Sequence, residues 1–332
     1  MFTKQITNRM IQVGILITRQ YRLLSVAAIL DVLETVNTFY QQSADPQPYH
    51  ISLLHLESDS DKFSTPYWGY ETRSIHQTDA MQLIIIPAFK TEDIKQAVGD
   101  NYQYIPWLQQ QFAAGAEIAT VCTGAFLLGA TGLLNGKSAT THVDACNAFA
   151  NAFPAIDLKA DKTVTCDGRL YTSGGATSSF HLLLHLIHQH CGRDIAVRTA
   201  KIFAIDMDRE NQAYFSTFQP MRGHTDNIVA STQQKIEASY QDTGTIEEMI
   251  KDIPASRRNI VRRFKQVTGI TPIEYLQHTR VEAAKKLLVQ TAQQMTEVIM
   301  NSGYSDPKAF RKIFRKTVGM TPSEYREKFC VR

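Results

Sequence analysis

Residues 263–275 read RFKQVTGITPIEY and residues 313–325 read IFRKTVGMTPSEY, so one sequence pattern occurs twice, fifty positions apart. Phe, Gly, Thr-Pro and Glu-Tyr fall at the same places in both copies, which is more agreement than a chance alignment gives. Helical periodicity predicts an amphipathic helix ahead of each copy, over residues 246–250 and 295–300. The repeat therefore predicts an all-α C-terminal region made of two copies of one unit.

A short turn and a capped helix follow each of these first helices. In the first copy, Ser256 is a natural N-cap. In the second copy, Asp306 can cap the helix, and Pro307 stands at the first helical position, where proline is tolerated. Helix, short turn and capped helix is the plan of a helix-turn-helix, so two such units are predicted.

Each capped helix has an apolar face and a basic face. Helical spacing places on the inner faces Ile260, Phe264 and Val267 in the first helix, and Phe310, Ile313 and Phe314 in the second. The outer faces carry Arg257, Arg258, Arg262, Lys265, Lys308, Arg311, Lys312 and Arg315. A single basic helix is usually only solvated, but two of them in the second position of a repeated unit favour entry into the DNA major groove.

The charge of the chain is divided unevenly. The net charge is +3, from 35 Lys and Arg against 32 Asp and Glu. Residues 221–332 hold 19 of the basic and 12 of the acidic groups, which is a net charge of +7. The other residues hold 16 basic and 20 acidic groups, which is a net charge of −4. A basic tail domain on an acidic body suggests a polyanionic partner, although solvated helix faces would give the same count.

The first 210 residues alternate between strand-like and helix-like segments. Strands are predicted at residues 11–17, 50–56, 83–86 and 117–121, and helices at 26–39, 125–134 and 177–190. Apolar strands separated by helices indicate an α/β domain with a largely parallel sheet covered on both faces. Because strand signals stop after Gln212, the predicted domains are residues 1–212 and 231–332, joined by a linker at 213–230.

Composition excludes several classes of protein. Hydrophobic residues make up 43% and charged residues 20%, as in soluble globular proteins. Uninterrupted apolar runs are far shorter than the ~20 residues of a membrane helix, and no signal peptide is recognised. The five cysteines include no CxxC pair, so neither a disulfide framework nor a zinc site is expected. We expect a cytoplasmic protein without membrane contact.

Cys122 stands where a predicted strand passes into a predicted helix. The segment 117–128 reads EIATVCTGAFLL, which is the pattern of a nucleophile elbow. The N-terminus of the following helix is expected to lower the pKa of the Cys122 thiol. His142 follows twenty residues later and is expected at the same edge of the sheet.

Three other histidines have helical metal-ligand spacing. His181, His185 and His188 lie at i, i+4 and i+7 of one predicted helix, but no acidic residue stands among them and leucines fill the positions between. We interpret them as partly exposed residues of a packed helix, and we expect neither a metal nor a cofactor.

Residues 233–329 resemble the DNA-binding domain of the AraC family of transcription regulators. The motifs that carry the resemblance are Ser256-x-Arg258-x-Ile260-x-Arg262-Arg263-Phe264, Gly303-Tyr304-Ser305-Asp306, Phe310-Arg311-Lys312-Ile313-Phe314 and the two Gly-x-Thr-Pro turns. The family usually has alanine where this chain has Ile250 and Ile299. The resemblance implies seven helices, double-stranded promoter DNA as the partner, and Arg258, Arg262, Lys308 and Lys312 as base-contacting residues, with Arg257, Arg311 and Arg315 beside them.

Residues 11–215 resemble the PfpI-like branch of the class I glutamine amidotransferase-like proteins, and more narrowly the sensor half of GlxA-type regulators. Besides the elbow, the motifs are Gly132-Leu133-Leu134-x-Gly136-Lys137-x-Ala139-Thr140-Thr141-His142 and Thr172-Ser173-Gly174-Gly175. The resemblance implies a flavodoxin-like fold. Thr123 stands where peptidase-like members have histidine, Ser25 near the usual acidic position, and Val143 where tryptophan is common. The catalytic set is therefore incomplete, and no enzymatic activity is expected.

These observations together favour a homodimeric transcription regulator. Its N-terminal domain is expected to bind a small effector near Cys122, Thr123, His142 and Ser25, and the GlxA resemblance suggests a nitrogenous metabolite. A PfpI-like cysteine hydrolase or amidase with an accessory DNA-binding domain is the alternative. A third hypothesis, in which the α/β domain serves only for dimerisation, stays open.

Overall fold

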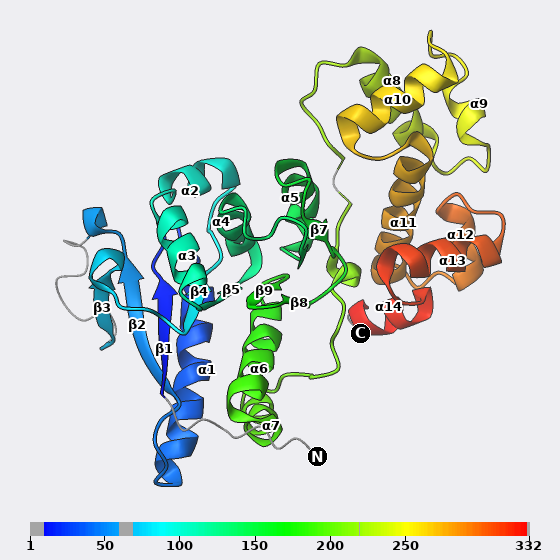
Figure 1. The fold of residues 1–332 in the computed structure, drawn as a ribbon. Helices are drawn as coiled ribbons and strands as arrows, with labels where there is room; N and C mark the ends of the chain where they lie inside the picture. The colour runs from blue at the N-terminus through cyan, green and yellow to red at the C-terminus, as the bar shows by residue number, and fades with distance from the viewer. Residues whose placement is uncertain (1–9, 60–68, 219, 331–332) are drawn as a thin grey trace. The chain divides into compact units, whose positions relative to one another are not determined.

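The computed structural model describes residues 10–59, 69–218 and 220–330, and it divides the chain into two compact units (Figure 1). The first unit ends at Gln212 and the second begins at Ala213. Each unit has its own hydrophobic cores.

A seven-stranded sheet forms the centre of the first unit, in the order β3-β2-β1-β4-β5-β9-β8. The strands are β1 (Ile11–Leu16), β2 (Tyr49–His55), β3 (Glu71–Ser74), β4 (Leu83–Ile86), β5 (Glu117–Thr120), β8 (Val164–Asp167) and β9 (Leu170–Ser173). Neighbouring strands pair in parallel except β8, which pairs antiparallel with β9. A small two-stranded sheet joins β6 (Ser138–Ala139) and β7 (Asp157–Leu158).

Helices cover both faces of this sheet (Figure 1). One face packs against α1 (Leu23–Gln42), α6 (Ser178–Cys191) and α7 (Arg193–Ile202). The other packs against α2 (Ile94–Asp100), α3 (Tyr104–Ala113), α4 (Ala125–Ala130) and α5 (Cys146–Ala152). The expected α/β class with a largely parallel, doubly covered sheet is confirmed. Helix α1 is long and apolar enough to cross a membrane, but 56% of its most apolar window is buried inside the protein, as in a core helix.

Within its described residues, the second unit consists of helices and the loops between them. It contains the short helix η5 (Ala213–Phe215) and then α8 (Asn227–Ser239), α9 (Ile246–Ile250), α10 (Arg257–Thr268), α11 (Pro272–Gln290), α12 (Met295–Asn301), α13 (Pro307–Val318) and α14 (Pro322–Phe329). The pairs α9–α10 and α12–α13 are the two predicted helix-turn-helix units, and α11 connects them. The seven helices implied by the resemblance are α8 to α14.

The repeated sequence folds in the same way both times. Gly269 ends α10 at φ +80° and Gly319 ends α13 at φ +83°, a left-handed conformation that glycine adopts without a Cβ clash. Thr271 and Thr321 then begin α11 and α14, and each makes a reciprocal capping box with the glutamate three residues later. The Gly-x-Thr-Pro motif therefore stops one helix and starts the next.

Candidate functional site

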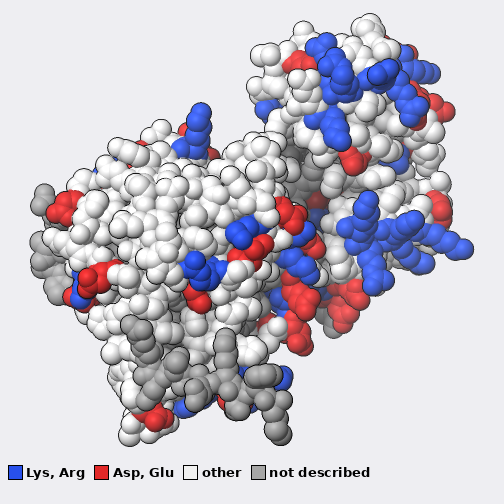
Figure 2. All heavy atoms as spheres, viewed as in Figure 1, with Lys and Arg blue, Asp and Glu red and all other residues white. Residues whose placement is uncertain are grey.

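The helices α10 and α13 present their basic residues to solvent. Ile260 and Phe264 of α10 and Phe310 and Phe314 of α13 are buried, at most 2% exposed. The exposed side chains of the two helices include Arg257, Arg258, Arg262, Lys265, Lys308, Arg311, Lys312 and Arg315. Figure 2 shows Lys and Arg atoms gathered in two places on the second unit. Each helix is thus amphipathic in the way that a groove-binding helix requires.

Neighbouring side chains arrange several of these arginines. Ser256 caps α10 by accepting a hydrogen bond from the backbone N–H of Asn259. Arg262 donates from Nη2 to the Asn259 Oδ1 at 3.1 Å, and Arg257 forms an exposed ion pair with Glu247 at 2.5 Å. Arg263, by contrast, donates to Asp226 at 2.8 Å and so holds α10 to the start of α8. Arg263 therefore has a structural role.

A surface groove runs beside α13. Its volume is about 770 Å³, and it is lined by Met295, Arg311, Lys312, Arg315, Lys316, Thr321, Pro322 and Ser323. Four of these eight side chains are cationic. The groove gives a polyanion a basic surface that extends from α13 to the start of α14.

The elbow at Cys122 has the geometry predicted for it. Cys122 begins the short helix η3 (Cys122–Gly124) directly after β5, and its φ of +55° is a strained value for a residue with a Cβ. A Cβ built on Gly124 would lie 2.6 Å from the carbonyl oxygen of Pro87 and 2.8 Å from that of Ile86. The close approach of the elbow to the end of β4 therefore requires glycine at position 124.

The pKa of the Cys122 thiol is raised to about 11, so the expectation that it would be lowered is wrong. Burial of the side chain is the main cause, and it outweighs the opposing effects of hydrogen bonds from Thr123 and the positive charge of Arg22. Only 4% of the residue is exposed. At neutral pH the sulfur is therefore a thiol and a weak nucleophile.

Ser25 and Thr123 are held by the backbone around the elbow. Ser25 donates from Oγ to the carbonyl oxygen of Arg22 at 2.7 Å and accepts from the N–H of Ala88 at 3.1 Å. The hydroxyl of Thr123 accepts from the N–H of Phe89 at 2.9 Å. The Ser25 hydroxyl thus fixes the start of α1 to the loop after β4, and the Thr123 hydroxyl fixes the elbow after β5 to the same loop.

The loop that carries His142 reaches the elbow through Thr141. Thr141 donates from Oγ1 to the carbonyl oxygen of Cys122 at 3.1 Å, which brings the 140–142 loop to the end of β5. His142 caps the short helix η4 (Val143–Ala145), and its Nδ1 accepts from the N–H of Asp144 at 3.2 Å. The Nε2 side of the ring faces Gly175.

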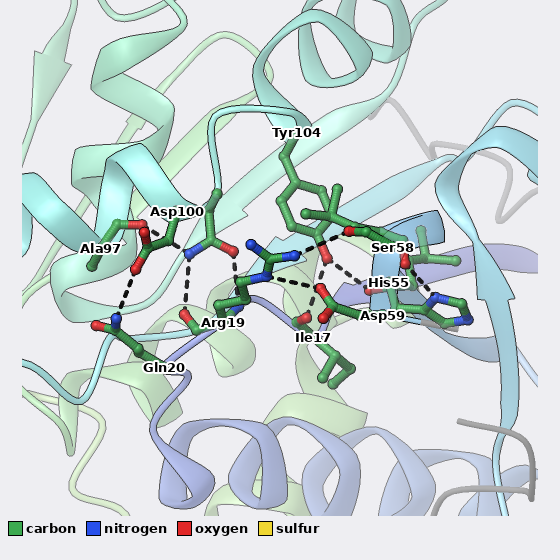
Figure 3. Close-up of polar contacts among 12 residues, drawn as sticks. Ile17, Arg19, Gln20, His55, Ser58, Asp59, Ala97, Asp100 and Tyr104 are labelled. Atoms are coloured by element: carbon green, nitrogen blue, oxygen red, sulfur yellow. Dashed lines mark hydrogen bonds and ion pairs between the residues drawn. The ribbon is translucent and has the colours of Figure 1, made fainter. Parts of the chain in front are cut away.

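A polar cluster that the sequence did not reveal fixes the loop after β1 (Figure 3). The Arg19 side chain donates to Asp59 and to Ser58, both at 3.0 Å. Asn101, which is fully buried, accepts from the N–H of Arg19 at 2.8 Å and donates to its carbonyl oxygen at 3.1 Å. Gln20 follows with φ +64°, a second strained residue at the carboxyl edge of the sheet. These contacts depend on residues far apart in sequence, so no local motif indicates them.

Three buried hydroxyls at the same edge of the sheet have no hydrogen-bond partner among the residues that the structure describes. Thr18 follows β1, Thr120 ends β5 and Ser178 begins α6, and each is at most 1% exposed. Buried hydroxyls are normally hydrogen-bonded, so these groups offer unused capacity to a bound molecule or to water.

The histidines of α6 line a separate cavity of about 390 Å³. His181, His185 and His188 share it with residues of β8 and of the segment 207–210. Burial lowers the pKa of His185, and a neighbouring positive charge on His188 would lower it further. Within the described ranges, no group of three or more His, Cys, Asp or Glu residues has the arrangement of a metal site.

Comparison with known proteins assigns both units. Residues 76–189 match the DJ-1/PfpI family, and residues 250–328 match a helix-turn-helix domain family. The transcriptional regulator GbdR of Pseudomonas aeruginosa is 26% identical over 226 residues, which are 68% of this chain and 61% of that protein. GlxA of Rhizobium meliloti, also named a transcriptional regulator, is 25% identical over 221 residues, 64% of this chain and 66% of that protein. The chain thus matches less than two thirds of the length of either regulator.

A solved structure supports the fold of the first unit. The crystal structure of a candidate transcriptional regulator from Vibrio parahaemolyticus covers 58% of this chain and 99% of its own, at 19% identity and a TM-score of 0.50. The resemblances predicted for the two halves are confirmed by the family matches. The chain is therefore built from a DJ-1/PfpI-family domain and an AraC-type helix-turn-helix domain, and its relatives include the transcription regulators GlxA and GbdR.

Proposed function

We propose that this chain is a sequence-specific DNA-binding transcription regulator. The observation that carries the proposal is the pair α10 and α13, each of them the capped second helix of a helix-turn-helix with a buried apolar face and an exposed basic face. A major groove admits such a helix, and arginine and lysine on its outer face can donate to guanine O6 and N7 and to phosphates.

The residues divide into two roles. Arg258 and Arg262 on α10, and Lys308 and Lys312 on α13, contact base edges in this proposal. Phosphate contacts come from Arg257, Arg311 and Arg315. The exposure of all seven side chains supports these assignments. Arg257 would exchange its ion pair with Glu247 for a phosphate, at little cost because exposed pairs contribute little to stability.

The first unit is proposed to be a sensor of a small metabolite. The effector binds at the carboxyl edge of the sheet, near Cys122, Thr123, His142 and Ser25, where ligands of open α/β sheets commonly bind. The unpartnered hydroxyls of Thr18, Thr120 and Ser178 support a polar ligand, and a nitrogenous metabolite would use such acceptors. The regulator acts as a homodimer in the cytoplasm.

A cysteine hydrolase is the second candidate, favoured by the strained backbone of Cys122. Two observations oppose it. Burial keeps the thiol protonated, and the hydroxyl of Ser25 is engaged by the backbone of Arg22 and Ala88 where an acid would be needed. We therefore propose that the chain is not an enzyme and that the elbow contributes contacts to the effector.

Selection of binding sites from random duplexes, followed by fluorescence anisotropy, tests the DNA-binding proposal. Arg258→Ala and Arg262→Ala should each weaken binding to the selected site by about 1–3 kcal/mol and relax preference at one base pair. Lys286→Ala removes an exposed cation from α11 and should leave binding almost unchanged. Equal affinity of the unmodified protein for selected and scrambled duplexes would overturn the assignment.

A thermal-shift screen of amino acids, amines and related metabolites tests the sensor proposal. A ligand that binds only the folded state at one hundred times its Kd should stabilise the protein by about 2.7 kcal/mol and raise its Tm. Gly175→Leu, which places a side chain beside His142, should abolish the shift if the ligand sits there. A shift that survives Gly175→Leu would place the ligand elsewhere.

A further inference from the structure

Gln212, the last residue of the first unit, is buried with its side-chain amide fully engaged. Its Nε2 lies 3.2 Å from the Thr140 hydroxyl, 3.0 Å from the Thr141 carbonyl oxygen and 3.1 Å from that of Ala160, and its two N–H groups are shared among these three acceptors. Its Oε1 accepts from the N–H of Gly175 at 2.9 Å. A glutamine near a domain boundary is usually a solvated surface residue, so this degree of engagement calls for a physical reason.

The space for this amide exists only because position 174 is glycine. A Cβ built on Gly174 would lie 1.9 Å from the Gln212 Oε1. The backbone N–H of Gln212 also donates to the carbonyl oxygen of Asp161 at 2.7 Å. Gln212 is thus enclosed by three loops of the first unit, 140–142, 160–161 and 174–175.

Two of those loops, 140–142 and 174–175, border the proposed effector site. Thr141, whose carbonyl oxygen accepts from Gln212, also donates to the carbonyl oxygen of Cys122. Gly175, whose N–H bonds to Gln212, lies beside the His142 ring, with a Cβ at that position 3.8 Å from Cδ2. A molecule that contacts Cys122 or His142 therefore acts on loops that hold Gln212.

The chain enters the second unit immediately afterwards. Tyr214 is 9% exposed and belongs to the same core as Phe310 and Phe314 of α13. The rings of Tyr214 and Phe329 have centroids 6.3 Å apart. Lys285 donates from Nζ to the carbonyl oxygen of Ser216 at 2.5 Å, so the residues that follow Ala213 are packed on the second unit.

We propose that Gln212 is the positioning residue through which the loops around Cys122 and His142 are coupled to the second helix-turn-helix. Only Ala213 separates Gln212 from Tyr214, and one residue spans at most ~3.6 Å. A buried amide keeps its hydrogen bonds, so a shift of the 140–142 or 174–175 loop displaces the Gln212 backbone. A single intervening residue transmits that displacement to Tyr214 and so to the core beneath α13.

The coupling can be measured from the DNA side because coupling between two binding equilibria is reciprocal. The Gly175 N–H donates to Gln212, so its hydrogen exchange reports that bond directly. In the full-length protein, a saturating duplex carrying the selected site should change the exchange rate of the Gly175 amide by roughly fivefold or more, read by fragmentation-resolved mass spectrometry.

Two variants separate coupling from simple stability. Insertion of Gly-Ser-Gly-Ser after Ala213 keeps Gln212 in place and should abolish the response of Gly175 while DNA still binds. The same insertion after Gly168, in the exposed turn between β8 and β9, should leave the response intact. If the insertion at the junction prevents folding, Gln212→Met supplies the test, because it keeps the length of the side chain and removes its hydrogen bonds.

The outcomes distinguish this inference from the proposed function on which it rests. If the protein binds all duplex sequences with equal affinity, both the proposed function and this inference are wrong. Tight, selective DNA binding with unchanged Gly175 exchange refutes the coupling and leaves the proposed function standing. The coupling is also refuted if DNA changes the hydrogen exchange of Gly175 equally in the unmodified protein and in either the Ala213 insertion variant or Gln212→Met.

Discussion

At the residue scale, burial decides the chemistry of Cys122. The backbone and side chain of Thr123 supply hydrogen bonds that favour a thiolate, and Arg22 adds a positive charge, yet the pKa of Cys122 is raised because the effect of burial exceeds both. The sequence shows the helix start but not the depth at which the sulfur lies. For this reason the position of the elbow could be predicted and the direction of its pKa shift could not.

Alkylation kinetics test the buried thiol. Iodoacetamide should modify Cys122 much more slowly than a cysteine in the unfolded chain, and the rate should continue to rise with pH up to about 11, because only the thiolate reacts. The exposed Cys166 is the internal control for access of the reagent. Peptide mapping after timed quenching gives both rates in one sample.

Because the pKa of Cys122 is raised, the stability of the folded protein should depend on pH in the alkaline range. The pKa of Cys122 is higher in the folded protein than in the unfolded chain. The buried neutral thiol therefore contributes fully to the free energy of unfolding below pH ~8.5, and this contribution is lost as pH rises through about 11. Rapid labelling of Cys122 at pH 7, or amidase turnover that disappears in Cys122→Ser, would contradict this account and support a hydrolase.

At the element scale, the glycine that ends α13 provides a test of the repeated turn. Gly319→Ala should destabilise the second unit by about 1–2 kcal/mol. The backbone φ is +83° there, and in this left-handed conformation the Cβ of alanine lies too close to the following carbonyl oxygen. Its Cβ would meet Ala213 only at an ordinary 3.7 Å, so the cost is conformational and not steric. Chemical denaturation of the full chain, followed through the second unit, measures the change.

Gly99 of α2 is the matched control. It lies in a helix, is exposed, and a Cβ there would meet nothing within 4 Å. Gly99→Ala should therefore stabilise the first unit slightly, by about 0.4–1 kcal/mol, measured by denaturation followed through that unit. Gly→Ala should thus lower the free energy of unfolding at position 319 and raise it at position 99. Equal changes at both positions would show that the left-handed backbone of Gly319 is not the cause.

Elements with a strong local pattern could be predicted from the sequence. Strand β4 and helix α9 have the predicted bounds, and β1, β2 and β5 agree within a residue or so, because apolar runs and caps mark them. The hairpin of β8 and β9 was not predicted, since Val164–Asp167 and Leu170–Ser173 mix polar and apolar residues and its strands are stabilised by pairing with each other and with β5. Gln212 gave no local signal either, because its partners come from three distant loops.

At the scale of the whole molecule, the uneven charge predicts a strong salt dependence of DNA binding. If Arg311 contacts a phosphate, Arg311→Ala should weaken binding to all sequences alike and reduce the slope of log affinity against log salt by about one. Titrations between low and physiological salt measure the slope. A loss confined to the selected sequence would instead make Arg311 a base-contacting residue.

The two cores of the second unit have a consequence for how its sequence can change over time. Phe264, Tyr275 and Leu276 pack in one core, whereas Leu288, Phe310 and Phe314 pack in the other, and α11 contributes to both. A substitution that loosens one core leaves the packing of the other in place. A change on the exposed face of α10 or α13 therefore leaves the core of the other half intact, so the two basic helices can vary independently while the shared helix keeps the two halves together.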